Sequence, residues 1–188
     1  MADLVSQIKG LDNVTYDLQD KVSTFGNENL FAWNIRTDDQ EITLNTYQNT
    51  GSFTQFSNSL QFDPSKTVGQ KYTISFDVIS PNGTTDVRLY NSNGNPKYFY
   101  FTSVTVATGV GNAWVHCQYT VTNNQNTSSS ASTNEAYIRR IEIYAPSKTG
   151  VKVKNIKVER GSKATDWTPA SKDLAGYISA SETIEFFQ

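Results

Sequence analysis

Apolar residues recur at two different spacings along the chain, and the spacing changes near residue 27. From Leu4 to Phe25 alternating steps of four and three residues give the a/d pattern of three heptads, with apolar residues at every position except the polar Thr15. A seam only two positions wide favours a self-associating coiled coil over the alternative, a lone amphipathic helix lying on the domain. Gly26 is suited to ending such a helix. We therefore expect an oligomerising coiled-coil helix over residues 1–26.

Beyond Glu28 the apolar and polar positions alternate, which is the period of strands with one buried face. In residues 72–78 the alternation places Ile74, Phe76 and Val78 on one face. The same rule predicts strands over residues 42–47, 87–90, 114–122, 136–144 and 151–158. Turn-forming Asn, Gly, Ser and Pro separate them, and no helical period lies between strands. The pattern predicts an all-β fold, an antiparallel β-sandwich, and excludes a parallel sheet with crossover helices.

Composition narrows the class of protein. Hydrophobic residues make up 37% and charged residues 18% of the 188 residues, while aromatics at 12% can still build a core. This favours a turn-rich β-protein over a helical bundle. A net charge of −2 offers no positive field for phosphates, so nucleic acid is not expected as a partner. A membrane partner and an export signal are not expected either, because there is no run of about 18 apolar residues and no signal-peptide pattern.

One Cys and one His exclude several chemistries. Cys117 has no intrachain partner for a disulfide, and a structural zinc site of several Cys and His ligands cannot be assembled. A serine or cysteine nucleophile would need His116, which lies beside Cys117 in a strand-like run where neighbouring side chains face opposite sides. His116 is therefore better explained as a polar strand residue than as a catalyst.

The most specific segment is residues 153–170, VKNIKVERGSKATDWTPA. In physical terms, Ile156 and Val158 would fill the core, Gly161 would permit a turn, and Trp167 would fold over an open end of the sandwich. The segment resembles the closing strand of jelly-roll carbohydrate-binding modules in bacteriophage tail and baseplate proteins. Further landmarks of the resemblance are Asn29-Leu30, residues 72–77, and Trp114 leading the strand that contains residues 119–122.

The resemblance covers roughly residues 27–170 and implies a jelly-roll module there, with 171–188 as a C-terminal extension or linker. It implies non-catalytic binding of host cell-surface saccharide, with host cell-wall polysaccharide and other tail or baseplate proteins as partners. The expected location is the virion, with assembly in the host-cell cytoplasm. Together with the helix it favours a homo-oligomer, a trimer first, because joined modules gain avidity where single sites are weak.

Two alternative functions stay open beside saccharide binding. One is a purely structural virion component that docks onto other tail proteins. The other is a polysaccharide-degrading enzyme, which needs two carboxylates across the scissile bond. Asp77 and Glu142 could be proposed for that pair, although no spacing singles them out.

A saccharide site needs exposed aromatic rings for the C–H faces of the sugar, flanked by carboxylate, amide or guanidinium groups for its hydroxyls. Strand alternation puts such groups on outer faces. The candidates for one polar-aromatic groove are Asp77, Arg88, Tyr90, His116 and Gln118. Further stacking candidates are Trp33, Tyr47, Tyr98 and Tyr100. The alternative for each residue is a solvated sheet face, or a core or edge position.

The resemblance also implies a structural calcium ion, which such modules often bind where the opening segment meets the last strand. Glu28 and Asp166 are the candidate ligands in this sequence. Calcium takes six to eight oxygen ligands, which carboxylates and loop carbonyls could supply. The sequence contains no D-x-D-x-D loop, and no other cofactor is expected.

Overall fold

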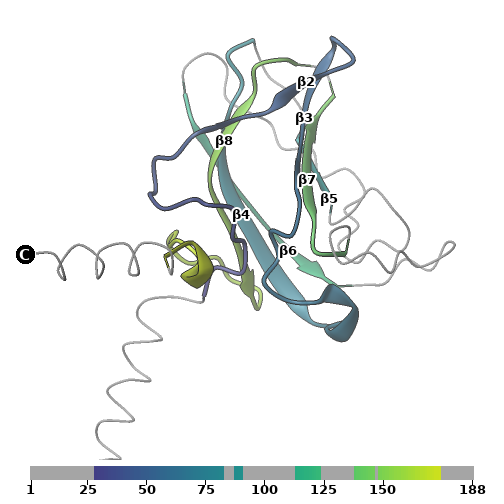
Figure 1. Cartoon of the computed structure of the whole chain (residues 1–188), viewed down its shortest axis with the longest axis vertical. Helices are drawn as coiled ribbons and strands as arrows, with labels where there is room; N and C mark the ends of the chain where they lie inside the picture. The colour runs from purple at the N-terminus through teal and green to yellow at the C-terminus, as the bar shows by residue number, and fades with distance from the viewer. Residues whose placement is uncertain (1–27, 83–86, 91–112, 124–137, 147, 175–188) are drawn as a thin grey trace, which may run out of the picture.

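The computed structural model describes residues 28–82, 87–90, 113–123, 138–146 and 148–174 (Figure 1). The predicted coiled coil over residues 1–26, the last residues of the extension, and Tyr98 and Tyr100 lie outside the described residues. Among the described residues, none of the helices has the length and apolar character needed to cross a bilayer.

The described strands form two four-stranded antiparallel sheets, which Figure 1 shows as two layers. The first sheet has the order β1 (Ile42–Thr43), β8 (Lys152–Arg160), β4 (Lys71–Ile79), β6 (Val115–Thr122). The second has the order β2 (Asn45–Tyr47), β3 (Gly51–Phe56), β7 (Ile141–Ala145), β5 (Arg88–Tyr90). From β3 onward, consecutive described strands alternate between the sheets, which is the arrangement of a jelly roll. The predicted antiparallel β-sandwich is confirmed.

The core lies between the two sheets and is built by the predicted alternation. Ile74, Phe76 and Val78 of β4 are at most 1% exposed and belong to one buried cluster with Ile141 and Ile143 of β7. On β6 the alternation also holds, since Cys117 is buried in this cluster and its neighbours at 115 and 119 pack against it. Burying each large apolar side chain stabilises the fold by roughly 1.5–3 kcal/mol. The packed inner faces therefore fix the strands whose outer-facing side chains form the candidate sites.

The structure differs from the predicted strands in three places. The strand predicted over residues 136–144 begins only at Ile141, because residues 138–140 form a turn before β7. Residues 42–47 form two short strands rather than one, because the chain passes from the first sheet to the second at buried Leu44, whose N–H donates to the Val151 carbonyl at 2.9 Å. Strand β3 was not predicted from the alternation because two of its buried positions carry hydroxyls, on Ser52 and Thr54. Ser52 Oγ accepts the Val151 N–H at 3.4 Å, so a polar group occupies a core-facing position.

The closing segment, residues 162–170, returns across the outer face of the first sheet. Thr73 and Ser75 do lie on that face, as predicted, yet they are only 2% and 3% exposed. Thr73 Oγ1 donates to the Gly161 carbonyl at 3.1 Å, where the chain turns. Gly161 has a φ of +98°, so the predicted role of this glycine in the turn is confirmed.

Three side chains hold the closing segment down, the buried Lys157 and Glu159 and the partly buried Thr165, and we call them the latch. The Glu159 carboxylate accepts the Thr165 N–H at 2.8 Å and its hydroxyl at 2.7 Å. Lys157 Nζ donates to Thr165 Oγ1 at 2.6 Å and to the Asp166 carbonyl at 2.7 Å, and lies 3.6 Å from Glu159 Oε2. Both charged side chains of the latch are 0% exposed. The latch therefore joins the end of β8 to the segment that covers it.

The opening segment is tied to the same strand. Asn29 Nδ2 donates to the Ile156 carbonyl at 3.1 Å and to the Thr168 carbonyl at 2.9 Å, while its Oδ1 accepts the Val158 N–H at 3.2 Å. Trp167 packs against the core and donates its indole N–H to the Ile156 carbonyl at 3.2 Å. The two ends of the module thus meet along β8, and Trp167 contributes to the fold there.

Candidate functional site

An open groove of about 430 Å³ lies where β1 of the first sheet meets β2 and β3 of the second, and Trp33 of the opening segment also lines it. The described residues that line it carry apolar, aromatic, hydroxyl and amide side chains, and none of these residues is charged. Trp33 and Phe53 supply the aromatic rings, and Asn45 and Gln55 supply the amides. We call this the aromatic groove, defined by Trp33, Asn45, Phe53 and Gln55.

Trp33 is held in place by a hydrogen bond to its backbone and by packing of its indole ring. Its N–H donates to one Asp173 carboxylate oxygen at 3.1 Å, and the next N–H, of Asn34, donates to the other at 2.8 Å. The indole lies at 89° to the buried ring of Phe56, with the ring centroids 4.8 Å apart. Trp33 is still 36% exposed, so one part of the ring is available on the surface. Asp173 lies beyond the predicted domain end at residue 170, and sequence reasoning missed it.

An aromatic cluster adjoins the groove on the outer face of the second sheet. Tyr47 lies 5.5 Å from Phe53 and 5.5 Å from Tyr144, measured between ring centroids. Phe53 and Tyr144 are paired directly across β3 and β7, so their side chains share one face. Tyr47 is 39% exposed. The structure thus places both of the described stacking candidates, Trp33 and Tyr47, at the surface of this sheet edge.

Strand β5 brings two further predicted residues to this sheet. Arg88 is paired with Tyr144 and Tyr90 with Glu142, so the backbone positions of these two residues belong to the same outer face. Glu142 itself is buried and forms an ion pair with Arg140 at 2.6 Å. The neighbouring carboxylate charge is therefore compensated within the protein.

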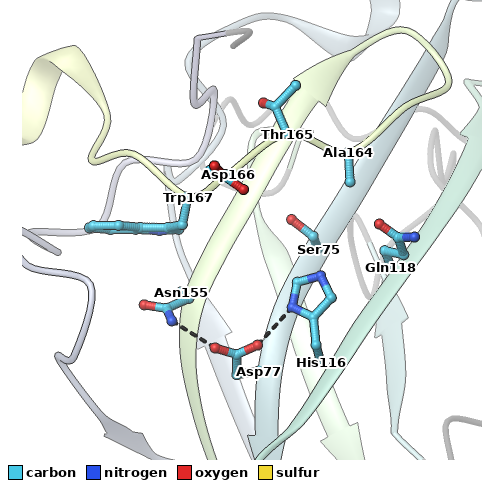
Figure 2. Close-up of a pocket in the computed structure, with 9 residues that line it drawn as sticks. All are labelled: Ser75, Asp77, His116, Gln118, Asn155, Ala164, Thr165, Asp166 and Trp167. Carbon is cyan, nitrogen blue, oxygen red and sulfur yellow. Dashed lines mark hydrogen bonds and ion pairs between the residues drawn. The ribbon is translucent and has the colours of Figure 1, made fainter. Parts of the chain in front are cut away.

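A second cavity, of about 260 Å³, lies on the outer face of the first sheet beneath the closing segment (Figure 2). We call it the Asp77 pocket. It is lined by Ser75, Asp77, His116, Gln118, Asn155, Ala164, Thr165, Asp166 and Trp167. Figure 2 shows Asp77 between two partners: its Oδ1 lies 2.7 Å from His116 Nδ1, and its Oδ2 accepts the Asn155 Nδ2–H at 2.7 Å.

A β-bulge builds one wall of this pocket. The register between β4 and β8 shifts between Ser75 and Asp77, and Asn155 on β8 has a φ of +54°. Asn tolerates this left-handed conformation better than most residues, and a bulge re-aims the side chain that it carries. Sequence reasoning did not select Asn155. The available signal was the broken alternation, since Val153 and Ile156 both face the core although they are three positions apart.

The structure divides the single groove expected from the sequence into two surfaces. Asp77, His116 and Gln118 line one pocket, where Asp166 joins them, whereas Arg88 and Tyr90 belong to the opposite sheet. The prediction of one shared groove was wrong because alternation along a strand tells which face a residue occupies but not which sheet the strand joins. For the same reason Asp77 and Glu142 do not flank one cleft as a glycosidase pair would.

The structure places the two calcium candidates as follows. The Glu28 carboxylate accepts the Ser171 hydroxyl at 3.4 Å, and the main-chain carbonyl of Asp166 accepts the Lys157 ammonium. Over the described residues, no three or more His, Cys, Asp and Glu side chains come together in a way that could hold a metal ion. These two residues alone fall short of the oxygens that calcium requires, so the ion stays a prediction from the resemblance.

The architecture is a jelly-roll β-sandwich. Comparison with solved structures finds similarity to the tripod from the baseplate of bacteriophage Tuc2009, at 17% identity and a TM-score of 0.47, covering 78% of this chain and 60% of that one. The chain is also similar to the CBM22-1 xylan-binding domain of Paenibacillus barcinonensis Xyn10C, at 14% identity and a TM-score of 0.38, covering 68% and 80%.

A third similar structure is a carbohydrate-binding module of Cellvibrio mixtus lichenase 5A in complex with cellotriose. It shows 16% identity and a TM-score of 0.41, covering 72% of this chain and 97% of that one. No protein-family profile and no curated protein sequence matches the chain. The function is therefore argued below from the residues of this chain.

Proposed function

We propose that this protein is a non-catalytic saccharide-binding module that attaches a bacteriophage tail or baseplate to saccharide on the host surface. The observation that carries the proposal is the aromatic groove, an uncharged cavity with exposed Trp33 beside the amide of Asn45. The Gln55 amide also lines the groove and is held in place, because it donates to Glu142 at 3.2 Å and accepts from Arg140 at 3.2 Å. Aromatic rings match the apolar C–H faces of a sugar, and amides match its hydroxyl groups. Exposed Tyr47 extends the aromatic surface beyond the cavity.

Binding without turnover is favoured by the chemistry of the groove. Glycoside hydrolysis uses two carboxylates that flank the bond, and none of the described residues that line the groove carries a carboxylate. The carboxylate next to it on the sheet, Glu142, is buried against Arg140. An open groove without a charged anchor would hold a neutral saccharide weakly, because ordering costs offset most of the contact energy.

The phage setting rests on the closing signature of residues 153–170 and on the heptad pattern of residues 1–26. A trimer formed through that helix would present several grooves together, which raises avidity by about 10²–10⁴-fold when the sites engage at once. Other tail or baseplate proteins would hold the oligomer in the virion. The calcium ion of Glu28 and Asp166 is a separate prediction, supported if EDTA lowers the melting temperature of the protein.

The test is a titration of the full chain with fragments of host cell-wall polysaccharide, followed by calorimetry and tryptophan fluorescence. Trp33→Ala and Tyr47→Ala should each weaken binding about tenfold, since a stacked aromatic ring contributes on the order of 1 kcal/mol or more. Trp114→Ala is the matched control, because Trp114 lies outside the groove, with its ring 4.8 Å from Lys154 Nζ. If no fragment binds saturably, the proposal fails and a purely structural role is favoured.

A further inference from the structure

Two consecutive N–H groups of the opening segment converge on one carboxylate. The N–H of Trp33 donates to one oxygen of Asp173 at 3.1 Å, and the N–H of Asn34 donates to the other at 2.8 Å. Asn34 has a φ of +60°, a left-handed conformation that Asn tolerates better than most residues. Successive N–H groups in such a turn form a concave site for an anion. The Asp173 side chain fills that site from within the chain, and the residue is only 7% exposed.

The part of the opening segment before Trp33 is fixed by other partners. The N–H of Ala32 donates to the Ser59 carbonyl at 2.8 Å, and Phe31 forms a β-bridge with Leu60. Trp33 and the residue after it are exposed. The hydrogen bonds to Asp173 therefore hold the backbone at the point where the chain leaves the core and the indole reaches the groove.

Asp173 is presented by a short turn at the end of the closing segment. Ala170 is 1% exposed, and its carbonyl accepts the N–H of Asp173 at 2.9 Å and that of Leu174 at 3.3 Å. The Ser171 hydroxyl donates to the Glu28 carboxylate at 3.4 Å. Figure 1 shows this turn, in yellow, beside the start of the described chain, in purple. The two ends of the module are thus joined next to the residue that carries the indole of the aromatic groove.

We propose that Asp173 is a positioning residue that holds Trp33 in the place where it binds saccharide. The proposal rests on the saccharide function of the aromatic groove and adds a residue that is not among the described residues lining it. When only a fraction of a protein is in its binding-competent conformation, the apparent affinity falls by that fraction. Loss of the Asp173 hydrogen bonds would lower the fraction with Trp33 in place. Binding would weaken although no saccharide contact is removed.

The test is a double-mutant cycle on the full chain, titrated by calorimetry with host cell-wall polysaccharide fragments of one defined length. Asp173→Asn keeps the shape of the side chain but replaces one oxygen by an NH2 group, which cannot accept from a backbone N–H. It should weaken binding about three- to tenfold, no more than the loss expected of Trp33→Ala. In the Trp33→Ala background it should change the affinity less than about twofold, because no indole is left to position. A merely structural role would weaken binding equally in both backgrounds.

Amide hydrogen exchange gives a readout that needs no variant. Because coupling between two sites is reciprocal, fragments that bind the wild-type chain should slow exchange of the Asn34 N–H, although Asn34 is not among the described groove residues. In Asp173→Asn without saccharide, the N–H groups of Trp33 and Asn34 should exchange at least about tenfold faster, while that of Ala32 keeps its protection. Should Asp173→Asn fail to fold, the wild-type measurement still decides.

Asp38→Asn is the matched control, because it removes the same charge from an exposed position of the opening segment. It should leave the affinity and the exchange rates unchanged. The inference is overturned if Asp173→Asn binds as tightly as the wild type, if it weakens binding equally with and without Trp33, or if bound fragments leave the Asn34 exchange unchanged. The saccharide function then stands, because it is read from the wild-type chain and the Trp33→Ala and Tyr47→Ala variants. If no fragment binds the wild-type chain, the proposed function fails and this inference fails with it.

Discussion

Removing the buried ammonium of the latch tests what holds the closing segment on the sheet. Lys157→Met keeps most of the side-chain volume but leaves the 0% exposed Glu159 carboxylate without its cation 3.6 Å away. It also removes the two hydrogen bonds to Thr165 and to the Asp166 carbonyl. Breaking one side of a buried ion pair costs about 3–5 kcal/mol, a large part of the roughly 5–15 kcal/mol that stabilises a typical domain.

Urea unfolding measures this loss as a fall in the midpoint at constant slope. Lys152→Met is the matched control, because the Lys152–Glu41 pair has 42% and 43% exposed side chains and should contribute less than about 1 kcal/mol. The double variant Lys157→Met/Glu159→Gln should recover part of the loss, since the amide oxygen can still accept from Thr165 and no buried charge remains. A Lys157→Met protein as stable as Lys152→Met would refute the role assigned to the latch.

Three further measurements follow from individual groups. Burial lowers the pKa of Lys157 below its ordinary 10.5, although Glu159 opposes the shift, so the unfolded chain binds this proton more tightly. Its contribution to the free energy of unfolding should therefore rise as pH rises toward 10.5, a slope that Lys157→Met would lack in urea titrations. Burial, with a smaller effect of Asp77, raises the pKa of Cys117 to about 11. The native thiol should therefore resist alkylation at pH 8 until urea unfolds the protein. Rapid labelling of the native protein, detected by mass spectrometry, would contradict this. Gly161→Ala forces a side chain into a φ of +98° and should cost about 1 kcal/mol or more, so an unchanged melting temperature would argue against the turn described here.

The buried face of a strand could be predicted from the sequence where its core-facing positions are all apolar and alternate with polar ones. Ile74, Phe76 and Val78 face the core because each gains free energy on leaving water, whatever the neighbouring strands are. Strand β3 shows the limit of this argument. Its core-facing positions include Ser52, which is satisfied by a hydrogen bond from Val151 rather than by apolar contact. Such a partner is set by tertiary structure and leaves no periodic signal.

For the candidate sites, the sequence predicts which face of its strand a residue occupies, but not which sheet that strand joins. Asp77 and His116 were correctly assigned to outer faces, and the pairing of β4 with β6 brings them together. Arg88 has the same alternation signal, yet its strand pairs with β7 in the other sheet. Pairing between strands distant in the chain decides this, and no local pattern records it. Asn155 enters the pocket through a bulge, which appears in the sequence only as a slip in the alternation.

The closing signature encodes the fold of this chain rather than its ligand. Ile156 and Val158 fill the core, Glu159 and Thr165 close the latch, and Gly161 makes the turn between them. The aromatic groove lies on β1, β2 and β3 and on the opening segment, outside residues 153–170. The groove residues take no part in the latch, but Ile42 belongs to the core and Trp33 packs against buried Phe56. Exposed groove positions such as Asn45 and Thr46 can therefore change with little loss of stability. Resemblance in the signature therefore predicts a shared jelly roll. The saccharide binding proposed above depends instead on the groove, where substitutions at exposed positions should alter affinity far more than stability.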